Sequence, residues 1–450
     1  MSALGFCLKA PLPGGAAVDR KMPLSMSSVA PGHSAESVAA RIALLYSPPI
    51  SETAVTQRLR LRKNADRRLK AGHLWLYSNE IDIEATPLKA FEPGSQAIIE
   101  AANGRAMGVA YVNPHSLICA RVVSRDTATG LDRSLLVHRF KQALALRQRL
   151  YKKPFYRLVH GEGDLLPGLV IDRFDDVVVV QLNTLGMERV RDEIIDALDK
   201  VLSPRAIVLR GDTAGRRLEQ LSGDVEVVKG TLDGPVMLEE NGARFGADVL
   251  GGQKTGWFFD HRDNRGWLNG LVEGKRVLDV FSYAGGWGVQ AAVNGAAEVV
   301  CVDASAPALA RVADNAALNG VGERVSTVEG DAFEVMTQLK TQGEQFDVVV
   351  LDPPAFIRKR KDIAAGERAY GRLNREAIRL LGRDGLLVSA SCSMHLATER
   401  LIDIVRGAAR HQDRHAQLLY QGHQGGDHPI HPAIPETAYL KALGVRIFRD

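Results

Sequence analysis

The sequence is poor in cysteine. Its 450 residues include four cysteines, at positions 7, 119, 301 and 392, with no CxxC pair and no histidine cluster at the spacing of metal ligands. Disulfide frameworks and zinc sites both require such patterns, so the sequence favours neither. We therefore expect a protein of a reducing compartment, the cytoplasm, that uses no metal.

Long hydrophobic runs are also missing. No apolar run approaches the roughly 20 residues that a membrane-spanning helix needs. Near the N-terminus, Lys9 and Arg20 flank the sequence Pro-Leu-Pro-Gly-Gly, which is unlike the apolar centre of a signal peptide. We expect no association with a membrane.

The net charge is small for a chain of this length. A formal charge of +4 means that any argument about charged partners depends on where the charge is concentrated. One stretch, between residues 58 and 70, is markedly basic and contains a single acid, Asp66. Its cations are Arg58, Arg60, Arg62, Lys63, Arg67, Arg68 and Lys70. Such a stretch is typical either of a solvated surface or of contact with nucleic-acid phosphates.

The composition, 45% hydrophobic and 24% charged, suits two or three globular domains. Residues 1–56 are rich in Ser, Pro, Gly and Ala without a sustained period, which predicts a disordered leader or an over-extended start, with Met22 and Met26 as alternative starts. Short strand-like pieces predict a β-rich domain over 57–128, and mixed signals predict a central α/β domain over 129–247.

From about residue 248 to 450, strand and helix signals alternate, as in the βαβ units of a parallel sheet. The last two predicted strands, 416–420 and 439–448, have no helix between them, which predicts an antiparallel hairpin at one sheet edge. Cys119 and Cys301 lie inside apolar strands and are expected to pack in the core.

A glycine-rich turn follows the first strand of this region. The strand 277–281 leads into Ser-Tyr-Ala-Gly-Gly-Trp-Gly, and glycines at such a turn let a cofactor approach the backbone. Gly286, Gly288 and Ala291 also satisfy the dinucleotide pattern GxGxxA, so an NAD enzyme is one alternative. Asp279 inside the strand argues against it, because a carboxylate suits an ammonium group better than a pyrophosphate.

S-Adenosyl-L-methionine carries an amino group and a sulfonium and has no phosphate, so it fits an acidic strand end. Asp303 would then bind the ribose hydroxyls, and Asp331 would reach the adenine amino group. The alternative is that these two aspartates are N-caps of the helices that follow them. Three acids at successive strand ends, Asp279 included, favour the cofactor site.

Two further strands end in reactive groups. Asp352 follows the strand 346–351 and begins a rigid Asp-Pro-Pro turn, while Cys392 ends the apolar run 385–393. Because the carboxyl ends of parallel strands form the ligand crevice, both should face one pocket. Methylation at C5 of a pyrimidine needs a nucleophile to add first at C6, and a thiolate is the usual adding group. A Cys392 thiolate could add to C6 of a cytosine while Asp352 hydrogen-bonds or protonates N3.

The target base would have to be flipped out or unpaired, and Phe356 could stack on it. Two other interpretations of these residues stay open. Cys392 could be an inert small hydrophobe, and a guanine-N methyltransferase on the same fold would have no use for a thiol.

Several strings in the chain are similar to those of a known family, the bacterial 23S ribosomal RNA large subunit methyltransferase I family. They are Lys254–Asp263, Phe281–Gly286, Leu351–Pro354, Ser391–Ser393 and Asp427–Pro429. The resemblance runs from about Gln57 to Phe448, and one departure is Met394, where the family has glycine.

The resemblance implies a PUA-like RNA-binding domain, a small central domain, and a class I methyltransferase domain with a Rossmann-like, mostly parallel seven-stranded sheet. It implies methylation of cytosine C5 in 23S rRNA or a large-subunit precursor, at position 1962, with the basic stretch in the PUA-like part contacting phosphates. The expected cofactor site comprises Lys254, Gly256, Asp260, Arg262, Asp279, Phe281, Ser282, Tyr283, Gly285, Gly286, Asp303, Asp331, Ala332, Asp352 and Pro353.

An alternative of a different class is a non-catalytic RNA-binding or ribosome-assembly factor with a vestigial cofactor pocket. The sequence leaves open the oligomeric state, a homodimer included, the state of the RNA substrate, and the base that removes the C5 proton.

Overall fold

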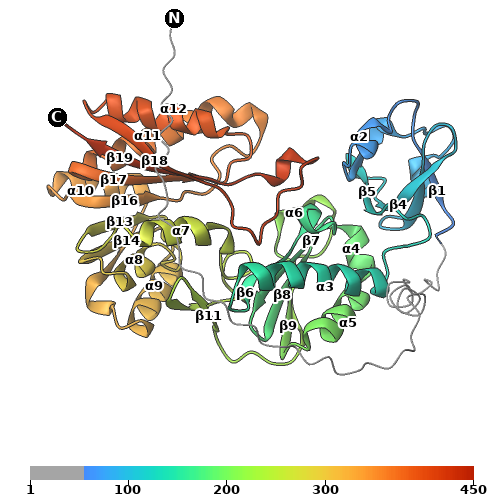
Figure 1. Cartoon of the computed structure of the whole chain (residues 1–450), viewed down its shortest axis with the longest axis horizontal. Helices are drawn as coiled ribbons and strands as arrows, with labels where there is room; N and C mark the ends of the chain where they lie inside the picture. The colour runs from blue at the N-terminus through green and yellow to red at the C-terminus, as the bar shows by residue number, and fades with distance from the viewer. Residues whose placement is uncertain (1–54) are drawn as a thin grey trace, which may run out of the picture. The chain divides into compact units, whose positions relative to one another are not determined.

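The computed structural model describes residues 55–450 (Figure 1). The predicted leader, with the alternative starts Met22 and Met26, lies outside the described residues. Within 55–450, no helix combines the length and apolar character needed to cross a membrane. The same residues contain no group of three or more His, Cys, Asp or Glu side chains placed to hold a metal ion.

The first part of the described chain is a small five-stranded sheet. Its strands, in spatial order, are β1 (Arg58–Arg60), β3 (Gln96–Glu100), β4 (Ala106–Val112), β5 (Ile118–Ser124) and β2 (Trp75–Tyr77). β3 and β4 are joined through Asn103-Gly104, where Gly104 has φ +82°, a conformation that glycine adopts without steric cost. Strand β2 was not predicted from the sequence. One short helix, α2 (Arg67–Lys70), also belongs here.

A second five-stranded sheet occupies the middle of the chain. In spatial order it consists of β10 (Val225–Lys229), β9 (Ala206–Arg210), β8 (Val177–Leu182), β7 (Leu169–Phe174) and β6 (Phe155–His160). Its helices are α3 (Arg133–Leu150), α4 (Leu185–Arg189), α5 (Arg191–Leu202) and α6 (Ala214–Leu218). Alternate residues of β8 point to opposite faces, so Val178 packs with α3 and α5 while Val177 joins the core of the C-terminal region.

The C-terminal region contains a seven-stranded sheet, as the sequence predicted. In spatial order its strands are β15 (Val325–Glu329), β14 (Glu298–Asp303), β13 (Arg276–Val280), β16 (Phe346–Leu351), β17 (Leu381–Ser391), β19 (Lys441–Phe448) and β18 (His415–Gly422). The first five are parallel, and β19 runs antiparallel to both of its neighbours. The predicted antiparallel hairpin at the sheet edge is therefore confirmed.

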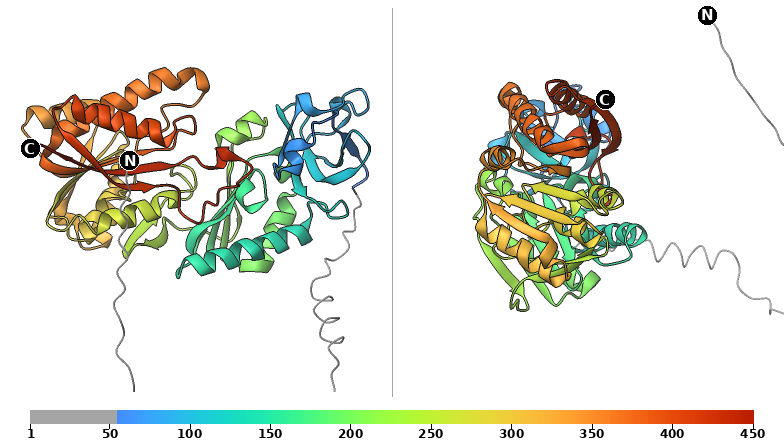
Figure 2. Two further views of the ribbon diagram at one scale, coloured as in Figure 1. Left: turned by 45° about the horizontal axis from the view of Figure 1, so that its top comes forward. Right: turned by 90° about the vertical axis from the view of Figure 1, so that its left-hand side faces the viewer.

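Helices cover both faces of this sheet, which explains its nearly uninterrupted apolar strands. α8 (Gly288–Val293) and α9 (Ala306–Leu318) cover one face, and α10 (Ala332–Thr341), α11 (Ile363–Leu380) and α12 (Thr398–Arg410) cover the other (Figures 1 and 2). α7 (Arg262–Asn269) precedes β13.

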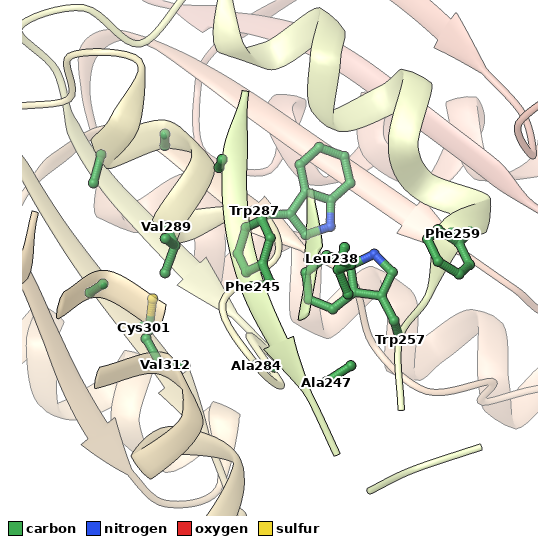
Figure 3. Packing of buried hydrophobic residues seen from close by; sticks show 14 of the residues in the cluster. Leu238, Phe245, Ala247, Trp257, Phe259, Ala284, Trp287, Val289, Cys301 and Val312 are labelled. Atoms are coloured by element: carbon green, nitrogen blue, oxygen red, sulfur yellow. The ribbon is translucent and has the colours of Figure 1, made fainter. Parts of the chain in front are cut away.

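The largest core joins the middle and C-terminal regions. The hairpin β11 (Val236–Glu240) and β12 (Ala243–Ala247) packs there against Trp257 and Trp287 (Figure 3). Cys301 is fully buried in this core, and Cys119 is fully buried in the core of the N-terminal sheet. Both expectations of inert packing are confirmed.

Candidate active site

A cavity of about 520 Å³ opens at the carboxyl ends of the parallel strands. Loops that follow β13, β14, β15, β16 and β17 line it, together with the segment that precedes α7. Most of the predicted site residues are brought together here. They are Lys254, Asp260, Phe281, Ser282, Tyr283, Gly286, Asp303, Asp331, Ala332, Asp352, Pro353 and Cys392.

Four predicted cofactor residues do not line the cavity. Gly256 and Gly285, with φ of +98° and +80°, shape the loops behind its wall. Arg262 is buried beside Glu240, with its guanidinium 4.3 Å from the ring centre of Tyr151. Asp279 is fully buried within β13. A direct contact of these four with a cofactor stays a prediction.

The turn after β13 is held in an unusual conformation. Phe281 and Tyr283 have φ of +67° and +48°, in the left-handed region that side chains disfavour. The amides of Phe281 and Ser282 donate to the Val302 carbonyl at 2.9 and 3.0 Å, and the Tyr283 amide donates to Asp303 Oδ2 at 2.9 Å. β14 therefore fixes the turn that forms one wall of the cavity.

Asp303 and Asp331, the two predicted cofactor aspartates that line the cavity after β14 and β15, have different local roles. Asp331 is the N-cap of α10, where its Oδ1 accepts from the amide of Phe333 at 2.9 Å. Asp303 is no N-cap, because Ser305 caps α9 and Asp303 instead accepts from the amides of Tyr283 and Ser305. The N-cap interpretation is thus right for Asp331 and wrong for Asp303, and both side chains still line the cavity.

Three buried oxygens in and behind the cavity wall have no hydrogen-bond partner among the described residues. They are Asp260 Oδ1, Asp279 Oδ1 and Ser282 Oγ. An unpaired buried polar atom costs about 1–3 kcal/mol, so such a group is evidence for a polar ligand. The three acceptors match a ligand that carries an ammonium group and hydroxyls, as S-adenosylmethionine does.

Asp279 is the carboxylate most affected by its surroundings. Its Oδ2 accepts from the Gly288 amide at 2.9 Å, but burial, reinforced by the carboxylates of Asp352 and Asp303, raises its pKa to about 7. Near neutral pH an added positive group would shift Asp279 toward its charged form.

Asp352 lies at the end of β16 between two donors. Its Oδ1 is 3.2 Å from His261 Nε2, and Trp287 Nε1 donates to its Oδ2 at 3.2 Å. Burial would raise the pKa of Asp352, but His261 and Trp287 outweigh it and hold the pKa below its usual range. Asp352 is therefore a carboxylate at neutral pH, an acceptor and not a proton donor.

A hydroxyl network fixes the turn that carries Cys392. Ser391 Oγ donates to the Tyr370 hydroxyl at 2.8 Å, and that hydroxyl lies 3.0 Å from Ser393 Oγ. Ser393 Oγ also accepts from the amide of Ile357, in the loop after Asp352, at 3.1 Å. The positions of the thiol and the carboxylate are therefore coupled through hydrogen bonds.

Lys441 is a buried cation beside the same turn, and it was not predicted from the sequence. It faces Ser391 across the β17–β19 pair and donates from Nζ to the Ser393 carbonyl at 2.6 Å. The side chain is only 6% exposed, and burial lowers its pKa to about 8. Burial raises the pKa of Cys392, as does Asp352, while the positive charge of Lys254 acts in the opposite direction.

His261 and Trp287 were not predicted either. His261 is within the family string Lys254–Asp263, and Trp287 is within the glycine-rich turn, so both lay next to predicted residues. The only signal for Lys441 was a charge at the start of a mostly apolar strand, which also contains Arg446.

Most of the predicted RNA-binding cations are engaged within the N-terminal sheet. Arg58 and Arg60 pair with buried Glu100, and Arg68 pairs with Glu80 while its guanidinium stacks on Tyr77. Lys70 pairs with Asp66, and Arg62 Nε donates to the Ile81 carbonyl at 2.9 Å. Of the seven, Lys63 and Arg67 alone form no side-chain hydrogen bond or ion pair with the residues 55–450.

Phe356, the predicted stacking residue, lies outside the cavity lining. Its ring centre is 4.8 Å from that of Tyr370, and the side chain packs against the core on the α11 face. Stacking of Phe356 on a base stays a prediction.

The chain matches the S-adenosylmethionine-dependent methyltransferase family over residues 156–446, and a PUA-like domain over residues 59–125. A solved structure of a protein described as a methyltransferase, complexed with SAH, shares the fold with a TM-score of 0.74 at 20% identity, covering 87% of this chain and 100% of that one. A second solved structure, of a protein from Streptococcus mutans described as a SAM-dependent methyltransferase, aligns with a TM-score of 0.73 at 20% identity. It covers 87% of this chain and 100% of that one. The family match over residues 156–446 makes this chain an S-adenosylmethionine-dependent methyltransferase, and the solved structures share its fold.

Curated relatives define the family more closely. Proteins named ribosomal RNA large subunit methyltransferase I are 36% identical over 397 residues in Shewanella denitrificans and 35% identical over 395 residues in Cronobacter sakazakii. Each alignment covers 87% of this chain and 99% of the relative. The chain belongs to the ribosomal RNA large subunit methyltransferase I family, and its cofactor is S-adenosylmethionine.

Proposed function

We propose that this protein transfers a methyl group from S-adenosylmethionine to C5 of a cytosine in 23S rRNA, through a covalent bond between Cys392 and C6. The observation that carries the proposal is that Cys392 and Asp352 line the same cavity as Asp260, Asp303 and Asp331. The names of the relatives support ribosomal RNA as the substrate class. Position 1962 is the expected target.

The acidic residues orient the cofactor in this proposal. Asp279 pairs with the ammonium group, Asp303 binds the ribose hydroxyls and Asp331 reaches the adenine amino group. When bound, the cofactor supplies an electrophilic methyl group directed at the target base. The unpaired oxygens of Asp260 and Ser282 provide further acceptors in the same cavity.

Cys392 performs the difficult step. C5 of cytosine is a poor nucleophile until a thiolate adds to C6, which leaves an electron pair that C5 uses to form its bond to the methyl group. Loss of the C5 proton to a base then restores the C5–C6 double bond and expels the Cys392 thiolate. The cycle returns the enzyme to its starting state, with one methyl group and one proton exchanged at C5.

Asp352 and Lys441 both support this addition. Because the pKa of Asp352 is low, its carboxylate accepts a hydrogen bond from the N4 amino group and so orients the cytosine for addition at C6. Lys441 places a positive charge beside the Ser391–Ser393 turn, which favours the thiolate over the thiol. A guanine-N methyltransferase would need neither Cys392 nor this cation.

We expect cofactor affinity to depend on pH through Asp279. The pKa of this carboxyl is raised from 3.8 to about 7 in the free protein, so below pH 7 it is neutral and cannot pair with an ammonium group. Calorimetry with S-adenosylhomocysteine should show that affinity rises between pH 5.5 and 7, by up to about tenfold per pH unit, and stays constant above pH 7. Proton release on binding should appear in the same pH range.

Asp279→Asn should bind more weakly and lose this pH dependence. Asp314→Asn, a change at an exposed carboxylate of α9, serves as the control and should keep the original profile. An unchanged pH profile in Asp279→Asn would contradict the assignment of the ammonium site.

Removal of the thiol should separate chemistry from binding. Cys392→Ala is expected to lower the methylation rate by at least about a thousandfold, because the nucleophile is removed, with S-adenosylhomocysteine affinity within about twofold of the original. Bisulfite sequencing of rRNA from a deletion strain complemented with each variant measures base, position and activity together. Cys119→Ala, which removes a buried thiol of the N-terminal sheet, should retain methylation.

Normal cytosine methylation by Cys392→Ala would overturn the thiolate mechanism. Methylated guanine in place of methylated cytosine would support the guanine-N alternative.

Removal of the buried cation should make the thiol less reactive. In Lys441→Met, the midpoint of the pH dependence of Cys392 alkylation by iodoacetamide is expected to rise by about one pH unit, because the thiolate then lacks a nearby positive charge. Peptide mass spectrometry assigns the alkylation to Cys392. Lys340→Met, at an exposed position of α10, is the control, and identical profiles for the two variants would contradict a role for Lys441.

A further inference from the structure

Four consecutive cations begin at the lining of the active-site cavity. Arg358, Lys359, Arg360 and Lys361 follow the Asp352-Pro353-Pro354 turn, all four are exposed, and Arg358 lines the cavity itself. The sequence alone drew attention instead to the denser basic stretch 58–70 as the place of RNA contacts.

These four side chains are free of competing partners within residues 55–450. None forms an ion pair or side-chain hydrogen bond there, and the acids of the adjoining helix α11 are otherwise engaged, Glu367 with Arg400 and Glu376 with Arg379. The contrast with the N-terminal basic stretch is clear, because five of its seven cations are held by internal partners. The residue after Lys361, Asp362, is the one acid beside the four cations and forms no ion pair with them, so the cluster keeps a net positive charge that attracts a polyanion.

The backbone that carries the four cations is fixed relative to the thiol. The preceding residue, Ile357, is 2% exposed and donates its amide to Ser393 Oγ, next to Cys392. A Cβ on Gly366 of α11 would lie 2.2 Å from the Ile357 side chain, so helix and loop are in close contact. The amide of Asp362 donates to the Lys359 carbonyl at 2.9 Å and closes a short helical turn.

We propose that Arg358, Lys359, Arg360 and Lys361 form a phosphate-binding rim that holds the RNA backbone beside the target nucleotide. This inference rests on the proposed function and extends it. A base can enter the cavity only if it leaves its stack, and the phosphates flanking it must then lie at the cavity mouth. Arginine forks and lysine ammonium groups bind phosphate oxygens without reading the base, so the rim positions the strand and the cavity selects the base.

The test is a fourfold charge-neutralised variant, Arg358→Gln, Lys359→Gln, Arg360→Gln and Lys361→Gln together. Its matched control changes the net charge equally at exposed positions elsewhere in the C-terminal region, namely Lys275→Gln, Lys340→Gln, Arg406→Gln and Arg410→Gln. The ligand is a short single-stranded RNA with the target cytosine, and binding is measured by fluorescence anisotropy at several salt concentrations. Single-turnover methylation and S-adenosylhomocysteine calorimetry complete the set.

We expect the rim variant to bind RNA at least about tenfold more weakly than the control. The slope of log affinity against log salt should fall by about 0.7 for each phosphate that the variant no longer neutralises. S-Adenosylhomocysteine affinity should stay within about twofold of the original, and any residual product should still be methylated at the same cytosine. RNA affinity and salt slope equal to those of the control would overturn the proposal, even if turnover fell, and would point to another partner for these cations.

The binding measurement also separates this inference from the proposed function. Cys392→Ala should abolish turnover and keep RNA affinity, whereas the rim variant should weaken RNA affinity. If the intact protein bound the RNA with the expected salt dependence but produced no 5-methylcytosine, the proposed chemistry would fail while the rim remained supported.

Discussion

The hydroxyl groups of Tyr370 and Ser393 connect the ends of β16 and β17, and the arrangement of the active site depends on that connection. Through Ser391 Oγ and the Ile357 amide they fix the Cys392 turn against the loop that begins with Asp352. The cofactor cavity lies on one side of this connection, and the basic rim begins one residue after Ile357. A displacement here would alter nucleophile, carboxylate and RNA contacts together.

Burial gives the site its chemistry as well as its shape. It raises the pKa of Asp279 to about 7, lowers that of Lys441 to about 8, and raises that of Cys392. At neutral pH Lys441 therefore keeps most of its positive charge, and Asp279 is close to its midpoint of ionisation. A bound ammonium group would favour the carboxylate form of Asp279, and the Lys441 charge favours a thiolate at Cys392.

The sequence predicted the sheet and the residues at its strand ends because apolar runs mark buried strands and because carboxyl ends of parallel strands meet. It did not predict Lys441, since β19 becomes a neighbour of β17 only through the order of the folded sheet. Nor could it show that Glu100, from β3, engages Arg58 and Arg60. Charge density along the chain directed attention to the N-terminal basic stretch and away from the cations that begin at Arg358, while the internal partners of the first set became visible only in the fold.

The covalent bond between Cys392 and cytosine C6 is the central claim, and RNA containing 5-fluorocytidine at the target position tests it directly. Fluorine at C5 cannot leave as a proton does, so the methylated adduct cannot release the thiolate. The account predicts a stable, S-adenosylmethionine-dependent protein–RNA complex whose mass includes one methyl group and whose cross-linked peptide contains Cys392. Turnover of normal RNA without any such complex, or a cross-link at another residue, would contradict it.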